Sequence, residues 1–116
     1  MFDVKYYELP NGEKPVQQFI DSLNVKMRVK ALGCIEILEE FGNQLREPFS
    51  KPISKGLFEL RIQFAGDITR IFYFFFKDNI IVLTNGFIKK IRKTPPGEIA
   101  LALKYKKDYE ERHKKK

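Results

Sequence analysis

Apolar and polar residues alternate along the segment that begins at Leu57. From Leu57 to Ala65 one face is apolar and the other polar, with Phe58, Leu60, Ile62 and Phe64 set against Glu59, Arg61 and Gln63. A period of two residues is typical of a β-strand with one buried face. The pattern therefore predicts a strand that presents Arg61 on the face opposite its apolar side chains.

Two further strands are predicted directly after this one. Ile68–Lys77 is apolar on both faces over much of its length, which is typical of a central strand covered on both sides. Asn79–Ile88 is again rich in β-branched and aromatic residues. The breaks Gly66-Asp67 and Asp78-Asn79 contain residues that tolerate the positive φ of a tight hairpin. Three consecutive antiparallel strands are therefore expected.

Two amphipathic helices are predicted before these strands. Pro15 suits the first turn of a helix, and apolar residues follow it at helical spacing: Val16, Phe19, Ile20 and Leu23. A second helix is predicted over Val25–Phe41, with Gly42 as its stop. Its apolar stripe consists of Ala31, Cys34, Ile35, Leu38 and Phe41. The short gap between the two helices favours an antiparallel hairpin laid on the sheet.

The remaining segments complete the expected order of elements. Phe2–Leu9 has strand character and is expected at a sheet edge, whereas Asn43–Lys55, with two prolines, is expected to be a polar connection. Thr94 is predicted to cap a last helix that opens at Pro95-Pro96 and runs to about Arg112.

The order β-α-α-β-β-β-α predicts an α+β fold. We expect an antiparallel four-stranded sheet with the helices on one side: a helical hairpin and a C-terminal helix. Residues 1–116 are the length of a single domain with a modest core, to which eleven Phe and five Tyr contribute.

Charge is distributed unevenly along the chain, whose net charge is +7. Residues 1–50 carry six Lys or Arg against eight Asp or Glu, whereas residues 51–116 carry sixteen against seven. The excess in the second half predicts a polyanionic partner, such as RNA or DNA, or an acidic protein. The simpler interpretation, that the charge keeps a small protein soluble, stays open.

Several kinds of chemistry lack the residues they need. The chain contains one His, His113 in a charged tail, and one Cys, Cys34 within a helical pattern. A His-based nucleophile pair, a zinc cluster of cysteines and an internal disulfide are therefore not expected, and no Gly-rich phosphate loop is present. We expect no metal and no cofactor. A single cysteine, with neither a signal peptide nor a long apolar run, suits a reducing cytoplasm.

Arginine, lysine and tyrosine remain as candidates for a functional site. Arg61 lies mid-strand and Arg70 opens the next strand, while Lys89, Lys90, Arg92 and Lys93 place four cations within five residues. Such groups bind phosphates and stabilise developing negative charge, and crowding lowers the pKa of a lysine. For Arg61 the alternative is a surface ion pair with Glu59, for Arg70 a hairpin-end charge, and for the lysines a solvated loop. Tyr73 is expected in the core, whereas Tyr105 is more open to stacking on a base.

Three blocks of sequence carry a family resemblance: GLFELRI, RIFYFF and GFIKKIRKTPPGEI. Together they resemble RelE/HigB-type toxins of type II toxin–antitoxin systems, and in particular their phage-derived branch within the RelE/ParE superfamily. The resemblance spans nearly the whole chain. It implies a small toxin that enters the ribosomal decoding site and cuts mRNA until a cognate antitoxin holds it inactive.

The resemblance also implies roles for individual residues. Arg61, Arg70, Lys89 and Lys90 match the family's catalytic positions. From the distribution of basic residues, the expected RNA-binding residues are Lys55, Arg92, Lys93, Lys104, Tyr105 and Lys107. Related sequences often have His-Gly-Phe where this chain has Asn85-Gly86-Phe87. Asparagine cannot transfer a proton near neutral pH, so a lysine or tyrosine would have to do so, or the ribosome would have to supply geometry that the toxin lacks.

Two functional hypotheses from different classes follow. The first is a ribosome-dependent mRNA endonuclease in which the RNA 2′-hydroxyl attacks the adjacent phosphate. The second is a ParE-like inhibitor that binds DNA gyrase without nuclease activity. The expected partners are the ribosome, mRNA and an antitoxin with a DNA-binding helix-turn-helix that buries the basic face. A phage remnant that binds RNA without toxicity is a further possibility.

Overall fold

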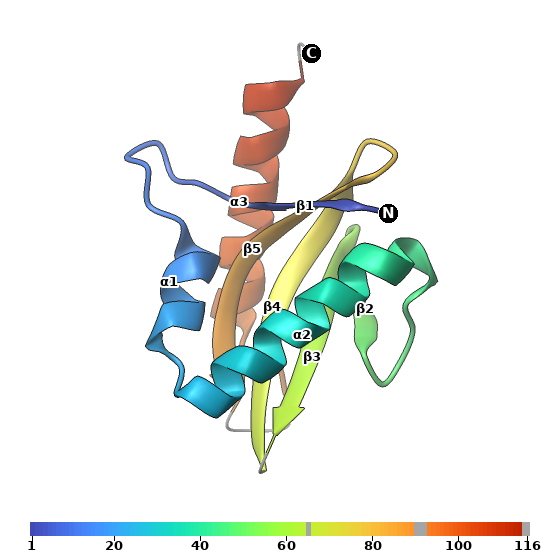
Figure 1. Cartoon of the computed structure of the whole chain (residues 1–116). Helices are drawn as coiled ribbons and strands as arrows, with labels where there is room; N and C mark the ends of the chain where they lie inside the picture. The colour runs from blue at the N-terminus through green and yellow to red at the C-terminus, as the bar shows by residue number, and fades with distance from the viewer. Residues whose placement is uncertain (65, 90–92, 115–116) are drawn as a thin grey trace.

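The computed structural model describes residues 1–64, 66–89 and 93–114 and shows an α+β fold (Figure 1). Its elements, in chain order, are β1 (Asp3–Tyr6), α1 (Pro15–Ser22), α2 (Val25–Phe41), the 3-10 turn η1 (Gly42–Gln44), β2 (Ser50–Ser54), β3 (Leu57–Phe64), β4 (Asp67–Phe76), β5 (Ile80–Lys89) and α3 (Pro96–His113). The predicted class and both N-terminal helices are confirmed, and the bounds of α2 agree with the prediction.

The sheet differs from the predicted one in its strands and in their directions. In the described part of the chain it has five strands, in the order β1-β5-β4-β3-β2. The strands β2 to β5 run antiparallel to their neighbours, but β1 pairs with β5 in parallel. The prediction of a four-stranded antiparallel sheet was therefore wrong.

The additional strand, β2, lies within the segment that was expected to be a connection. The two prolines in this segment argued against a strand, because proline has no backbone N–H group to donate to the hydrogen bonds of a sheet. Pro52 is tolerated because β2 is at the edge of the sheet, where it pairs with β3 alone. Lys55 and Gly56, both with positive φ, form the tight turn between these two strands.

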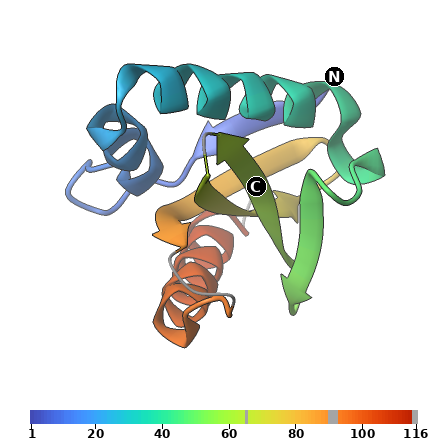
Figure 2. The same cartoon turned by 90° about the horizontal axis from the view of Figure 1, so that it is seen from below.

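Helices cover both faces of the sheet, which corrects the expectation that they all lie on one side. Figure 2 shows α2 on one side of the strands and α3 on the other. The face under α1 and α2 packs the main core, which includes Ile20, Leu38, Leu60, Ile71 and Leu83. The opposite face packs Leu57, Phe72 and Phe87 against Ala102 of α3. The central strand is therefore covered on both sides, as its apolar pattern predicts.

The helix ends follow sequence signals at α2 but not at α3. The Asn24 side chain accepts a hydrogen bond from the Met27 backbone at 2.9 Å, and Gly42 ends α2 with a φ of 48°. A Cβ at Gly42 would lie 2.0 Å from the Phe2 ring, so this stop requires glycine. At α3, Pro95 occupies the N-cap position that was predicted for Thr94. Within the described residues, no helix is long and apolar enough to cross a bilayer.

Candidate functional site

Arg61 and Arg70 face each other across the central pair of strands. The register of β3 and β4 pairs these two residues directly, and directly paired residues project from the same side of a sheet. Because Leu60, Ile62 and Ile71 point toward α1 and α2, strand alternation places both arginines on the face that α3 covers. Two predicted site residues from separate motifs thus come together.

A buried carboxylate lies between the two arginines. The side chain of Glu59 is 1% exposed, and its Oε1 atom lies 3.3 Å from Nε of Arg70 and 3.5 Å from Nε of Arg61. Neither Nε atom forms an aligned hydrogen bond within the described residues. Thr94 donates a hydrogen bond from Oγ1 to Glu59 Oε2 at 3.2 Å. Glu59 therefore holds both guanidinium groups through their charges and is fixed by the residue that leads into α3.

Lys89 and Lys51 extend this group of charges onto the neighbouring strands. Lys89 pairs in register with Ile68, two residues before Arg70, and Lys51 pairs with Glu59. Burial is the largest cause that lowers the pKa of Lys89 below its ordinary value. The positive charges of Arg70, Arg61 and Lys51 lower this pKa further, and Glu59 opposes them. We call Lys51, Glu59, Arg61, Arg70 and Lys89 the cation cluster.

The other predicted site residues are placed less closely together. Lys90 and Arg92 lie outside the described residues. Lys93 is exposed beside Thr94, Lys55 is exposed in the β2–β3 turn, and Lys104 and Lys107 are exposed on α3. These four lysines lie outside the strands that carry the cation cluster.

Tyr105 differs from the role expected for it. Its ring stacks on Tyr7 with a centroid distance of 4.4 Å and an interplanar angle of 22°, so the ring packs α3 onto the sheet. This geometry does not support a Tyr105 ring that stands open for stacking on a base. Tyr73, by contrast, is buried in the core as predicted, and its hydroxyl contacts that of Ser50.

Sequence reasoning missed the position of Glu59 and the participation of Lys51. Glu59 was considered only as a surface partner of Arg61, yet it is buried between two cations. The sequence did contain a signal for the burial of Glu59. Strand alternation places Glu59 and Arg61 on the same face, and because β4 is apolar on both faces, that face of the sheet is also expected to be covered. Lys51 could not be found, since its strand was not predicted.

Asn85 connects β5 to the start of α3. Its side chain is buried, accepts a hydrogen bond from Thr84 Oγ1 at 2.7 Å, and donates from Nδ2 to Glu98 Oε1 at 3.1 Å. Since an amide does not titrate near neutral pH, these contacts position α3 and offer no acid or base.

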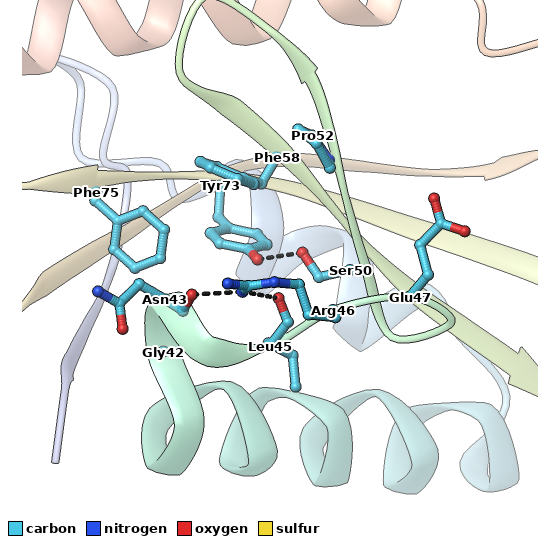
Figure 3. Close-up of a pocket in the computed structure, with 10 residues that line it drawn as sticks. All are labelled: Gly42, Asn43, Leu45, Arg46, Glu47, Ser50, Pro52, Phe58, Tyr73 and Phe75. Carbon is cyan, nitrogen blue, oxygen red and sulfur yellow. Dashed lines mark hydrogen bonds between the residues drawn. The ribbon is translucent and has the colours of Figure 1, made fainter.

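A separate hollow of about 570 Å³ lies on the other face of the sheet, beside the end of α2 (Figure 3). Phe58, Tyr73 and Phe75 form part of its lining. The guanidinium group of Arg46 donates to the backbone oxygens of Asn43 at 2.7 Å and Leu45 at 3.1 Å. This arginine is thus already engaged by backbone, whereas the cation cluster brings several charged groups together. The cluster is the stronger candidate.

The cation cluster is suited to holding a phosphate group. Paired guanidinium groups bind phosphate oxygens and neutralise charge that develops on them, and a lysine with a lowered pKa can accept a proton. Among the described residues, no group of three or more His, Cys, Asp or Glu side chains is arranged to hold a metal ion. The fold and this cluster define a small α+β protein in which cationic side chains gather around a buried carboxylate.

The chain belongs to the family described as "Phage derived protein Gp49-like (DUF891)", which matches residues 18–107. The match includes every residue of the cation cluster. This is a toxin-like family of toxin–antitoxin systems. No curated protein sequence matches the chain significantly.

Proposed function

We propose that this protein is the toxin of a toxin–antitoxin pair and that it cuts mRNA on the ribosome. The observation that carries this proposal is the pairing of Arg61 with Arg70 around the buried Glu59, with Lys89 beside them. Membership in a toxin-like family supports the same interpretation.

The proposed reaction is an attack of the RNA 2′-oxygen on the adjacent phosphorus. A P–O bond to the 2′-oxygen forms and the P–O5′ bond breaks, which leaves a cyclic phosphate and a free 5′-hydroxyl. Arg61, whose side chain is 26% exposed, holds the phosphate, and the buried Arg70 adds to the positive field that stabilises the charge on the phosphate oxygens. Lys89, in its neutral form, accepts the proton of the 2′-hydroxyl, and the 5′-oxygen takes a proton from water or from Lys90 or Lys93.

Exposed lysines outside the cluster provide the proposed grip on ribosomal RNA. Lys55, Lys104 and Lys107 are all exposed. Contacts of this kind are sequence-independent and weaken steeply as salt rises. The small number of catalytic groups is consistent with a toxin that depends on the ribosome to position its substrate.

The decisive experiment is the replacement of Arg61, because its side chain contributes charge to the cluster and little to the core. Arg61→Ala is expected to abolish growth arrest and codon-positioned mRNA cuts, measured by induction in bacteria and by primer extension. Lys14→Ala, which removes an exposed cation far from the cluster in sequence, is the control. Undiminished cutting by a folded Arg61→Ala protein would remove Arg61 from the mechanism.

One observation favours a second candidate function, a ParE-like binding inhibitor of DNA gyrase. Asn85 replaces the histidine found in many related toxins and is fully engaged in positioning α3. Intact mRNA after induction, together with inhibited DNA supercoiling by purified gyrase, would support this alternative and exclude the nuclease.

The toxin-like family also suggests an antitoxin as a partner. We propose that this antitoxin carries a helix-turn-helix and is encoded beside the toxin gene. Co-expression of that neighbouring gene should restore growth during induction.

A further inference from the structure

The hollow beside the end of α2 has an aromatic wall (Figure 3). The rings of Phe58 and Tyr73 stack with a centroid distance of 5.5 Å, and Phe75 meets them edge-on at 5.4 Å and 5.8 Å. Phe58 and Phe75 are half-buried, so part of each ring remains open to the hollow. The volume of about 570 Å³ is within the range of small-molecule sites, roughly 300–1,000 Å³. This wall is therefore suited to packing against a flat apolar ring of a ligand.

The backbone holds the guanidinium group of Arg46 at the border of the hollow through one of its nitrogens. Nη1 donates to the backbone oxygens of Asn43 and Leu45, whereas Nε and Nη2 have no hydrogen-bond acceptor within the described residues. Figure 3 shows the Glu47 carboxylate directed away from this group, and among the described side chains Arg46 forms no ion pair. The Nε and Nη2 edge is the one through which arginine binds a carboxylate or a phosphate with two parallel hydrogen bonds.

A buried pair of hydroxyl groups adds one more donor to the same hollow. Ser50 and Tyr73 are 3% and 1% exposed, and their hydroxyl groups hydrogen-bond to each other. The pair has two O–H hydrogens and uses one between its members, so the other has no acceptor among the described residues. Burial raises the pKa of Tyr73, whereas the hydrogen bond with Ser50 and the positive charge of Arg46 lower it, so the guanidinium charge reaches the phenol. A buried donor without a partner is unfavourable, which favours an acceptor at this position.

We propose that this hollow binds a small molecule that joins a flat ring to a carboxylate or phosphate group. The ring packs on Phe58 and Phe75. The anionic group accepts hydrogen bonds from Nε and Nη2 of Arg46 and from the remaining O–H of the Ser50–Tyr73 pair. Because all of these polar groups are donors, an anion fits the hollow better than a cation or a neutral donor does.

This ligand would not compete with a phosphate at the cation cluster. Phe58, Tyr73 and Phe75 pack with the core under α1 and α2, whereas the cation cluster is on the face that α3 covers (Figure 2). The proposal therefore goes beyond the proposed function and does not rest on it.

Two anionic probes with matched neutral controls test the site. Adenosine 5′-monophosphate is compared with adenosine, and indole-3-acetate with indole-3-acetamide, by titration into the isotope-labelled protein and measurement of amide chemical shifts. At least one anion should give saturable shifts at residues 42–51 and 73–75. That anion should bind about tenfold more tightly than its neutral control, since hydrogen bonds to charged groups are the stronger ones. The tighter of the two anions identifies the group as phosphate or carboxylate.

Variants of Arg46 separate the paired hydrogen bonds from charge alone. Arg46→Lys keeps the positive charge but loses the two-nitrogen edge, so it should weaken the tighter anion about tenfold. Arg46 is exposed, so Tm should change little. Lys30→Ala is the control, because Lys30 is an exposed cation of α2 that does not line the hollow, and its removal should leave the affinity unchanged.

Variants of the hydroxyl pair test the remaining donor. Ser50→Ala and Tyr73→Phe each leave one O–H in place, so each single variant should keep most of the affinity. The double variant leaves none and should weaken the anion about tenfold, while removal of both buried partners together costs the fold little.

Four results would overturn the proposal: no saturable binding of either anion, equal binding of each anion and its neutral control, shifts confined to the cation cluster, or an unchanged affinity in Arg46→Lys. An unchanged affinity in the folded double variant would also overturn it, since the hydroxyl pair would then have no part in binding. None of these readouts involves mRNA cleavage, so failure here is distinguishable from failure of the proposed function.

Discussion

At the scale of single residues, Glu59 has the strongest influence on the arrangement of the site. A carboxylate this deeply buried is stable only when cations compensate it, and Arg61 and Arg70 do so from two strands. The same carboxylate keeps the two guanidinium groups from separating by repulsion. Attraction between Glu59 and the two arginines therefore holds the site together, while the pairing of β3 with β4 places the two arginines opposite each other.

Glu59→Gln should be strongly destabilising, because it leaves two guanidinium groups without their counter-charge. The expected loss is about 3 kcal/mol in the free energy of unfolding, measured by urea denaturation. Glu110→Gln removes the partner of Lys106 in a more exposed ion pair, so it serves as a control and should change stability by about 0.5 kcal/mol or less. Similar values for the two variants would show that Glu59 is not held by its charge.

Lys89 should give mRNA cleavage a characteristic dependence on pH. Its pKa is lowered by burial and then by nearby cations, so more of the neutral amine is present at a given alkaline pH than for an ordinary lysine. If the neutral form is the base, the cleavage rate rises with pH and levels off below the ordinary value of 10.5. Lys89→Arg should lose this rising limb and about 100-fold in rate. A wild-type rate that does not change with pH would exclude Lys89 as the base.

At the scale of elements, local patterns predicted most helices and strands, and the failures have physical causes. The alternation of β3, the apolar run of β4 and the turn residues between strands all predicted elements within a few residues of their bounds. β2 was missed because prolines are read as breaks, although an edge strand accepts them. Thr94 is a favourable N-cap residue, but its hydroxyl donates to Glu59 instead.

The candidate site was predictable only where each strand's own pattern sets the side chain's direction. Alternation placed Arg61 on the face opposite Phe58, Leu60 and Ile62, but nothing local to β3 gives its register with β4 or β2. The pairing of Arg61 with Arg70, and of Lys51 with Glu59, is a tertiary property. The charge pattern and the resemblance to known toxins both indicated Arg70 and Lys89, whereas the position of Glu59 between two arginines depends on the pairing of β3 with β4.

Two glycines should respond in opposite ways to alanine. A Cβ at Gly86 of β5 would lie 2.4 Å from the Phe19 ring of α1, so Gly86→Ala should cost about 1–3 kcal/mol by overpacking. At Gly33 of α2 the space among described residues is open, so Gly33→Ala should add up to about 1 kcal/mol. Thermal unfolding of both variants would test this, and a destabilising Gly33→Ala would contradict the assigned backbone.

At the scale of the whole molecule, the two ends of the chain are joined to each other. The Tyr7 hydroxyl donates to Asp108 Oδ2 at 2.6 Å, and Arg112 donates to the Glu8 backbone oxygen at 2.6 Å. Tyr105 stacks on Tyr7 in the same region. These contacts hold α3 over the sheet, and with it Thr94, which bonds to Glu59 of the cation cluster.

This junction should make the fold sensitive to strongly alkaline pH. Burial, and then the hydrogen bond to Asp108, raise the pKa of Tyr7 from 10.0 to about 12. In the unfolded chain the phenol ionises near 10.0, so its stabilising contribution is complete below that pH and is lost as pH rises to about 12. The loss is on the order of 2–3 kcal/mol, since one pKa unit corresponds to about 1.4 kcal/mol. Tyr7→Phe should remove this part of the pH dependence in urea denaturation; an unchanged profile would contradict the assignment.

The contacts of β1 and Tyr7 with β5 and α3 also determine when the fold can be completed during translation. β1 is made before β5, with which it pairs in parallel. Tyr7, which follows β1, donates its hydrogen bond to Asp108, a residue 101 positions later in the chain. Contacts so distant in sequence form late. While α3 is still inside the ribosome, its face of the sheet, including Phe72 and Phe87, has no cover. A growing chain therefore cannot assemble the fully supported cluster until α3 has left the ribosome.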